Sequence, residues 1–493
     1  MSVASLLAKL NELTREGKVR EVTAEILRAS KGGLPRDELP ALADIAYRND
    51  QIALGLRILQ PMIRDAREGL APATPEALTI YATLLQRMGA IEEAGNYLLG
   101  IKNHTPALLR LAFIHFAKWD YHRAIPLLQR YISLLEGSYE ELVGRVNLLA
   151  AQIAIGDLPA AETSSRALHL KLDVFPQYKI LSGNCLELDA QMALLKGDLF
   201  HAEDLLRLAA LALDGQASRY LLFVNKWKAV VDLIKTPQSE TARQNVLKVR
   251  EDALHIRHWE TVRDCDFHLS RLTHDRDLLK RVLLGTPYRS FLDRIRLVYG
   301  ILPPTSRTLE FCPQKIGEKP LSIGLNLEDL PINCFLNSTS WALIQLMVKD
   351  LYRPPRIGVA FAALYPNEFF DVFHSPQRVR NSVFRFNQWT TQFNIPLKIL
   401  ARDGDLLLNC PPGLGVAFKA RSRPLSRNQA LLARFRLLSD GRSFTSDQLA
   451  LAMNMTRQSA LGLLRSALTS KRIAKIGRGK RTRYMFSSHR KPA

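Results

Sequence analysis

The sequence predicts a mainly α-helical chain in which an N-terminal array of paired helices precedes two small α/β domains. Three observations lead to this fold class. Apolar residues recur at helical spacing from about residue 5 to 300, where strand signals are nearly absent. Five prolines then interrupt the pattern between residues 301 and 334. Beyond that junction, short helices alternate with short β-prone runs.

Small residues recur in the first 300 residues at two matched places. Five alanines each lie four residues after a helix-breaking turn residue, and five further residues lie twelve positions upstream of them. The turn residues are Asn49, Ala90, Asp120, Asp157 and Asp198, the alanines Ala53, Ala94, Ala124, Ala161 and Ala202, and the upstream residues Ala41, Ala82, Ala112, Leu149 and Ala190. Small side chains at these places let antiparallel helices approach closely, and the pattern resembles the tetratricopeptide repeat.

The resemblance covers roughly residues 35–215, with degenerate copies, and it implies a tetratricopeptide-like α-solenoid over residues 1–300. Solenoids generally use a curved surface to hold a partner. We therefore expect the array to bind a protein, a peptide or a signal, and the alternative is a dimerisation or spacer platform.

Positive charge is concentrated at the C-terminal end. The formal net charge is +21, and the last 73 residues hold 17 Lys and Arg against Asp440 and Asp447, which gives 17 − 2 = +15. The remaining residues therefore carry only 21 − 15 = +6. A basic excess confined to one folded segment is typical of a nucleic-acid-binding module.

Composition and motif content exclude several classes of protein. The five cysteines are scattered and never form a C-x-x-C pair, which favours reduced thiols in the cytoplasm. We expect no signal peptide, membrane span, nucleotide-binding loop or catalytic motif, and hence neither an enzyme nor a cofactor. Asp403 and Asp405 flank a turn glycine and indicate a hairpin, not catalytic carboxylates. His255, His258, Cys265 and His268 have spacings that would suit zinc ligation, but the arginines around them favour ordinary charged helices.

The segment 421–487 is predicted to form a basic helix-turn-helix followed by a hairpin, and residues 488–493 are predicted to form a tail. A helix over 426–438 precedes a capping box at Thr445 and Gln448, a three-residue turn, and a longer helix capped by Thr456. Strands over 473–476 and 483–486 flank a glycine-bearing basic connection. The order resembles a winged-helix domain of the MarR-like kind, which implies that the second helix enters the major groove of double-stranded DNA.

That resemblance assigns two kinds of DNA contact. Residues of the second helix would approach base edges, and basic residues of the hairpin would neutralise phosphates or enter the minor groove. The first set comprises Thr456, Arg457, Gln458, Ser459 and Arg465, and the second comprises Arg478, Lys480, Arg481 and Arg483. The alternative is that the domain contacts protein and that the hairpin is a solvated tip.

The segment 335–419 resembles the DNA-binding effector domain of OmpR-type response regulators, although no receiver domain accompanies it. Its order is a helix over 339–351, a helix over 358–364, a loop, a long helix from Ser375, and a hairpin around Asp403. The resemblance implies that the long helix reads DNA and that the loop contacts RNA polymerase. The implied DNA-facing residues are Arg378, Arg380, Asn381, Arg385 and Asn387, the last standing where the family usually has a basic residue. A packing or dimerisation role is equally supported, since the segment carries only 9 − 5 = +4.

The sequence thus predicts a cytoplasmic, nucleoid-associated bacterial transcription regulator that binds double-stranded DNA and a protein partner, as a monomer or homodimer. One alternative is an interaction scaffold, because helical repeats followed by a winged helix also resemble proteasome-lid-type assembly subunits. The other is binding to structured RNA, because phosphate recognition alone does not distinguish the two polymers.

Overall fold

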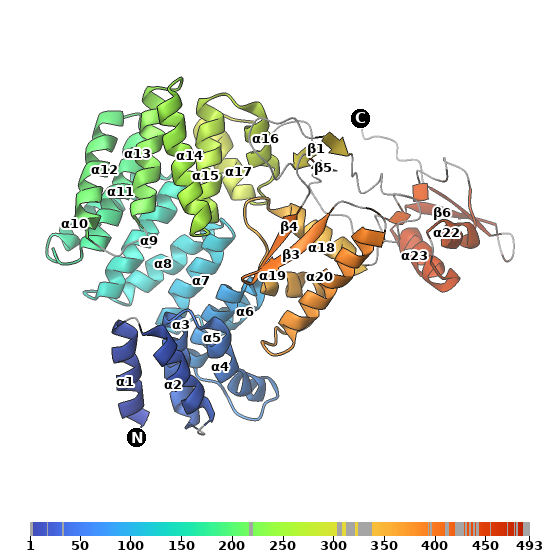
Figure 1. The fold of residues 1–493 in the computed structure, drawn as a ribbon, viewed down its shortest axis with the longest axis horizontal. Helices are drawn as coiled ribbons and strands as arrows, with labels where there is room; N and C mark the ends of the chain where they lie inside the picture. The colour runs from blue at the N-terminus through green and yellow to red at the C-terminus, as the bar shows by residue number, and fades with distance from the viewer. Residues whose placement is uncertain are drawn as a thin grey trace. The chain divides into compact units, whose positions relative to one another are not determined.

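The structure is a computed structural model of the chain. It describes residues 3–16, 18–31, 34–215, 220–302, 308–311, 321–323, 338–392, 394, 397–409, 414–419, 428, 431–432, 435–436, 439, 443–453, 455–470, 472–477, 479 and 482–486. The chain is mainly helical, as predicted, and Figure 1 shows its first 300 residues as helices that pack in chain order. No helix within the described ranges is both long and apolar enough to cross a bilayer.

Seventeen α-helices lie in the described part of the first 300 residues, in antiparallel pairs that end with a single helix. They are α1 (Val3–Arg15), α2 (Val19–Lys31), α3 (Leu39–Arg48), α4 (Ile52–Arg67), α5 (Pro75–Met88), α6 (Ile91–Gly100), α7 (Thr105–Ala117), α8 (Tyr121–Ser133), α9 (Tyr139–Ile155), α10 (Leu158–Leu172), α11 (Lys179–Leu195), α12 (Leu199–Leu213), α13 (Leu221–Lys235), α14 (Glu240–His255), α15 (Trp259–Leu272), α16 (Arg276–Leu284) and α17 (Arg289–Tyr299). The tetratricopeptide-like array is therefore present, and the helices beyond residue 215 continue it.

The predicted repeat register holds for four pairs of helices and is wrong for the first. The residues assigned to the later pairs, such as Ala82 with Ala94 and Ala190 with Ala202, are fully buried between helices. Ala53 is instead exposed, because Asn49 caps the end of α3 and Gln51 is the residue before α4, so the position four residues after the N-cap is Gly55. The close approach in this pair is made by Gly55, where a Cβ atom would lie 3.3 Å from the Ala43 carbonyl oxygen of α3 and 2.9 Å from the Leu84 side chain of α5. The first repeat therefore has its small residue two positions later.

Side-chain caps and left-handed glycines define the ends of the array helices. Thr74 and Ser138 each accept a hydrogen bond from the backbone N–H three residues later, and Asp157 and Asp198 cap α10 and α12 in the same way. Gly89 ends α5 at φ 92°. Each side-chain cap satisfies a helix N–H that would otherwise be unpaired, and the cap lies within a few residues of that N–H in the sequence.

The compact unit built around the array also contains residues 349–380 and 401–406. Within this unit α19 (Ile357–Leu364) packs on α5, and Gly358 lies so close that a Cβ atom would be 2.6 Å from the Met88 carbonyl oxygen. The backbone N–H of Phe370 donates to Glu93 of α6 at 2.8 Å. The predicted linear order of separate domains thus differs from the grouping of compact units in the structure.

A buried ionic cluster fixes residues 350–353 to α15. Arg263 is fully buried and donates two 2.8 Å hydrogen bonds to Asp350 and one of 2.7 Å to Glu260. Asp350 also accepts from the backbone N–H groups of Tyr352 and Arg353. Burial of a guanidinium is tolerated here because its charge is met by two carboxylates.

Two other buried ionisable groups lie in the array and respond to pH in opposite directions. Burial raises the pKa of Glu187 in α11 to about 7, partly offset by the Lys226 ammonium. Burial lowers the pKa of His268 in α15 to about 3. Folding therefore favours the neutral form of both side chains.

We expect Glu187→Gln to become more stabilising relative to the parent as pH rises from 4.5 to 8. The raised folded pKa means that the parent loses stability as pH rises between the unfolded value of 4.5 and about 7, whereas glutamine has no charge to bury. The expected gain is on the order of 2–3 kcal/mol at pH 8. Urea unfolding of both proteins at pH 4.5 and 8 measures this difference in unfolding free energy. The contribution of His268 cancels from the difference, because both proteins contain it. A difference independent of pH would contradict the assignment.

The second unit contains residues 305–348, 381–400 and 407–493. Strand β5 (Leu414–Lys419) pairs antiparallel with β1 (Thr308–Phe311) and parallel with β2 (Leu321–Ile323). The predicted junction therefore supplies two strands to a sheet. Helix α18 (Ser338–Lys349) follows, with its first eleven residues in this unit.

A helix and a hairpin each have residues in both units. Helix α20 (Ser375–Gln392) forms as predicted, but the Ser375 hydroxyl accepts from the Asp371 N–H instead of capping the first turn. Strands β3 (Lys398–Arg402) and β4 (Asp405–Asn409) form the predicted hairpin. Its turn residues Asp403 and Gly404 both have positive φ, 51° and 84°, as a type I′ turn requires.

Candidate nucleic-acid interface

The C-terminal residues form a short helix, a turn and a longer helix with the predicted bounds (Figure 1). Helix α22 (Ser446–Ala452) begins with the predicted capping box, in which Thr445 and Gln448 bond to each other's backbone N–H groups. Helix α23 (Arg457–Thr469) begins at Thr456, whose hydroxyl accepts from the Ser459 N–H at 3.2 Å. Thr445 and Thr456 fix where the two helices begin, because each hydroxyl satisfies a helix N–H that would otherwise be unpaired.

A small sheet follows α23 and completes the fold of this region. Strands β6 (Ile473–Ile476) and β7 (Arg483–Phe486) are antiparallel, and Phe444 bridges Tyr484 from before α22 through two backbone hydrogen bonds of 2.8 and 2.7 Å. The core below comprises Leu432, Phe435, Phe444, Leu449, Ala450, Met453, Ala460, Leu463, Leu464, Ala467, Ile473 and Tyr484. This core faces one side of α23 and leaves the other side exposed.

The exposed side of α23 carries the sequence-predicted residues. Thr456, Arg457, Gln458, Ser459 and Arg465 are all exposed. No acidic residue occurs in α23, and a Cβ atom on Gly462 would meet nothing within 4 Å. Thr456 and Ser459 are engaged in the cap, and Arg457 lies 3.0 Å from Asp447 of α22. The helix thus exposes two guanidinium groups, one of them paired with Asp447, and one amide.

The predicted hairpin residues are only partly described. Arg483 is exposed and donates to the Ser443 carbonyl oxygen at 2.9 Å, whereas Arg478, Lys480 and Arg481 lie outside the described residues. Lys475 of β6 is also exposed, and it was not among the predicted contacts. The sequence signal for it was a basic residue in a short strand next to the basic connection of the hairpin.

The residues predicted on α20 lie in different surroundings. Arg380, Asn381 and Arg385 are exposed, whereas Arg378 is ion-paired with Glu368 and lies 3.9 Å from the centre of the Tyr365 ring. Asn387 donates to the Ile399 carbonyl oxygen at 2.9 Å and accepts from the Ile399 N–H at 2.8 Å. An amide suits this position because it satisfies both groups of the strand, which a basic side chain would not.

The array has a groove of about 360 Å³ between its first helices. It is lined by residues of α1, α3, α5 and α7, among them Asn11, Tyr47, Thr79, Thr83 and Arg110. These residues are far apart in the sequence, so periodicity alone did not identify them. The lining mixes apolar surface with hydrogen-bonding groups, which suits a polypeptide segment more than a purely apolar ligand.

The histidines and the cysteine whose spacing would suit zinc do not lie around one point. His258 accepts from the Thr261 N–H through Nδ1, and Cys265 and His268 are buried at separate packing positions of α15. Among the residues that the structure describes, the group of His, Cys, Asp or Glu side chains close enough to share an ion is His169, Cys185 and Asp189.

Comparison with known proteins gives structural similarities only. No protein-family model and no curated protein matches the chain. A Rap protein complexed with competence and sporulation factor aligns with a TM-score of 0.42 and 9% identity over 57% of this chain and 85% of its own. A tetratricopeptide repeat protein from Parabacteroides merdae aligns with a TM-score of 0.39 and 15% identity over 55% and 99%. NprR in complex with its cognate peptide NprX aligns with a TM-score of 0.39 and 14% identity over 60% and 89%.

Proposed function

We propose that this protein is a regulator that binds double-stranded DNA through its C-terminal residues and a protein partner through its helical array. The C-terminal residues form a winged-helix domain in this proposal, with α23 in the major groove and the β6–β7 hairpin along the adjacent backbone. The observation that carries it is the exposed face of α23, where Arg457, Gln458 and Arg465 stand without an acidic residue on the same helix.

Charge supports DNA as the ligand of this face. Seventeen basic residues against two acidic ones in the last 73 residues exceed what solubility requires. Phosphate neutralisation would supply most of the affinity, and the arginine and glutamine side chains would prefer guanine and adenine edges. Helix α20 exposes Arg380 and Arg385, which are further candidates for phosphate contacts.

The partner site in this proposal is the groove lined by α1, α3, α5 and α7. Extended chains bind such concave surfaces because hydrogen-bonding groups and apolar patches alternate along them. A DNA-binding end joined to a partner-binding array is the arrangement by which a protein signal would reach a promoter.

The test is binding of the full chain to duplex DNA at several salt concentrations. With six to ten phosphate contacts, affinity should fall by roughly 10³- to 10⁵-fold between 50 and 200 mM salt. Arg465→Ala should weaken binding, whereas Arg289→Ala, which removes an equal charge from an exposed side chain at the start of α17, should not.

The competing functions predict different outcomes of the same titration. No binding at low salt would favour an assembly scaffold. Equal or tighter binding to an A-form RNA duplex than to B-form DNA would favour an RNA ligand. The major groove of A-form RNA is deep and narrow and excludes a helix such as α23, so a protein that inserts α23 into DNA should bind the RNA duplex less tightly.

A further inference from the structure

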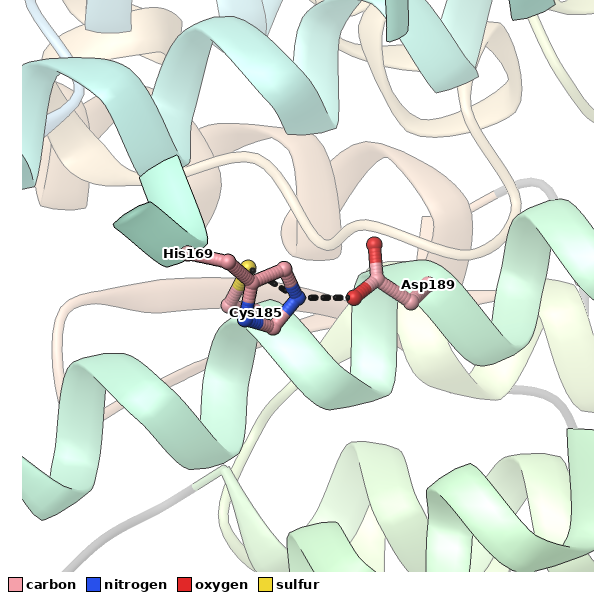
Figure 2. Close-up of side chains that lie close together, drawn as sticks. All are labelled: His169, Cys185 and Asp189. Carbon is pink, nitrogen blue, oxygen red and sulfur yellow. Dashed lines mark hydrogen bonds and ion pairs between the residues drawn. The ribbon is translucent and has the colours of Figure 1, made fainter. Parts of the chain in front are cut away.

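Three metal-ligating side chains meet between two consecutive helix pairs of the array. His169 lies on α10, and Cys185 and Asp189 lie one helical turn apart on α11, so that all three point to one place (Figure 2). The His169 Nε2 atom is 2.5 Å from an Asp189 oxygen and 3.5 Å from the Cys185 sulfur. The three ligand atoms lie within 4.8 Å of one another.

This trio does not form a nucleophilic triad. In such a triad the two imidazole nitrogens face different partners, one the nucleophile and the other the carboxylate. Here the same nitrogen, Nε2, faces both Cys185 and Asp189. Cys185 is also fully buried, and burial raises the pKa of its thiol, so it is not activated as a nucleophile.

The spacing fits a tetrahedral zinc ion better. Bonds of about 2.0 Å to nitrogen and about 2.3 Å to sulfur place those two ligand atoms about 3.5 Å apart at a tetrahedral angle. That is the separation found between His169 and Cys185. The Asp189 carboxylate would move back by less than about 1 Å to exchange its hydrogen bond for a metal bond.

The surroundings supply an outer shell and an approach for the ion. The Ser165 hydroxyl donates to the second oxygen of Asp189 at 2.6 Å, which orients the carboxylate toward His169. The His169 side chain is 38% exposed, whereas that of Asp189 is 12% exposed. The fourth coordination position would therefore face solvent and hold a water molecule.

Charge balance also favours a divalent ion. The three side chains together offer an imidazole, a thiol and a carboxylate. A divalent cation held by a neutral imidazole, a thiolate and a carboxylate would leave an assembly with no net charge. A neutral assembly is the least costly one in a half-buried place.

We propose that His169, Cys185 and Asp189 form a zinc site that links α10 to α11. The site joins two successive helix pairs, so the ion would stiffen the middle of the array. This inference does not depend on DNA binding or on the partner groove, and its ligands differ from the residues discussed for either.

The test is titration of the reduced full-length protein with Co²⁺ as a spectroscopic substitute for Zn²⁺. One equivalent should produce a thiolate-to-cobalt charge-transfer band, and Zn²⁺ should abolish the band by displacement. Cys185→Ser should remove the band, and Cys265→Ser, which alters another buried cysteine of the array, should retain it. Ser165→Ala should weaken binding by about 10- to 100-fold while retaining the band, as expected for an outer-shell group.

The outcomes separate the site from an ordinary ion pair. Metal affinity should rise with pH, because binding releases the protons of His169 and Cys185. Circular dichroism establishes that each variant is folded. Should Cys185→Ser unfold, Asp189→Asn is used instead, and it should weaken Co²⁺ binding more than Ser165→Ala does. Absence of the band at stoichiometric metal, or a band that survives in Cys185→Ser, would overturn the proposal.

Discussion

Replacing Arg263 by alanine is expected to destabilise the array unit by about 3–5 kcal/mol, the usual consequence of removing one partner from a buried ion cluster. Arg263 is fully buried and is the cation that meets both Asp350 and Glu260. Its loss would leave the Asp350 carboxylate with backbone donors but without its counter-charge. The guanidinium also stacks on Tyr288 and Tyr352, 5.1 and 5.4 Å from the ring centres, so the truncation would open a cavity as well.

Chemical denaturation of the full chain, monitored by circular dichroism, measures the loss. Arg276→Ala, which alters an exposed arginine at the start of α16, is the matched control and should change stability by less than about 0.5 kcal/mol. Combining Arg263→Ala with Asp350→Ala should cost less than the sum of the two single changes, because the second removes the carboxylate that the first exposes. Strict additivity would show that the two residues do not act as a pair.

The ion pair between Arg263 and Asp350 could not be predicted from the sequence. The two residues are 87 positions apart, and nothing in their local patterns distinguishes them from surface charges. The same holds for Arg257 of the array, which is ion-paired with Asp403 at the tip of the β3–β4 hairpin. Sequence patterns identified the hairpin from its Asp-Gly turn but gave no sign that the array holds it.

Elements defined by local signals were predicted almost to the residue. The two C-terminal helices follow capping residues whose hydrogen bonds lie within four positions, so their bounds could be read directly. The first array pair was predicted in the wrong register because Asn49 caps the end of α3 and Gln51, not Asn49, is the residue before α4. The cluster of His169, Cys185 and Asp189 needed the pairing of α10 with α11, which spacing along one helix does not reveal.

With α23 as the reading helix in the proposed function, the double substitution Arg457→Ala/Arg465→Ala is expected to abolish most of the preference for one DNA sequence over others. Each bidentate contact of an arginine with a guanine is worth about 1–3 kcal/mol of discrimination, so the pair should account for about 2–6 kcal/mol. Both residues lie on the exposed face of α23, whereas the core below holds Leu463 and Leu464. The substitutions therefore leave the packing of the helix unchanged, and alanine preserves its helical propensity.

Lys480→Ala is the comparison that separates base contacts from phosphate contacts. Lys480 belongs to the connection between β6 and β7. Loss of a phosphate contact should weaken binding to all sequences alike and reduce the salt slope by about one. Selection of preferred sites from a random duplex library with the parent chain, followed by competition binding of all three proteins, gives both quantities. Equal losses on preferred and random duplexes from the arginine substitutions would remove α23 as the reading helix, because only contacts with base edges distinguish one sequence from another.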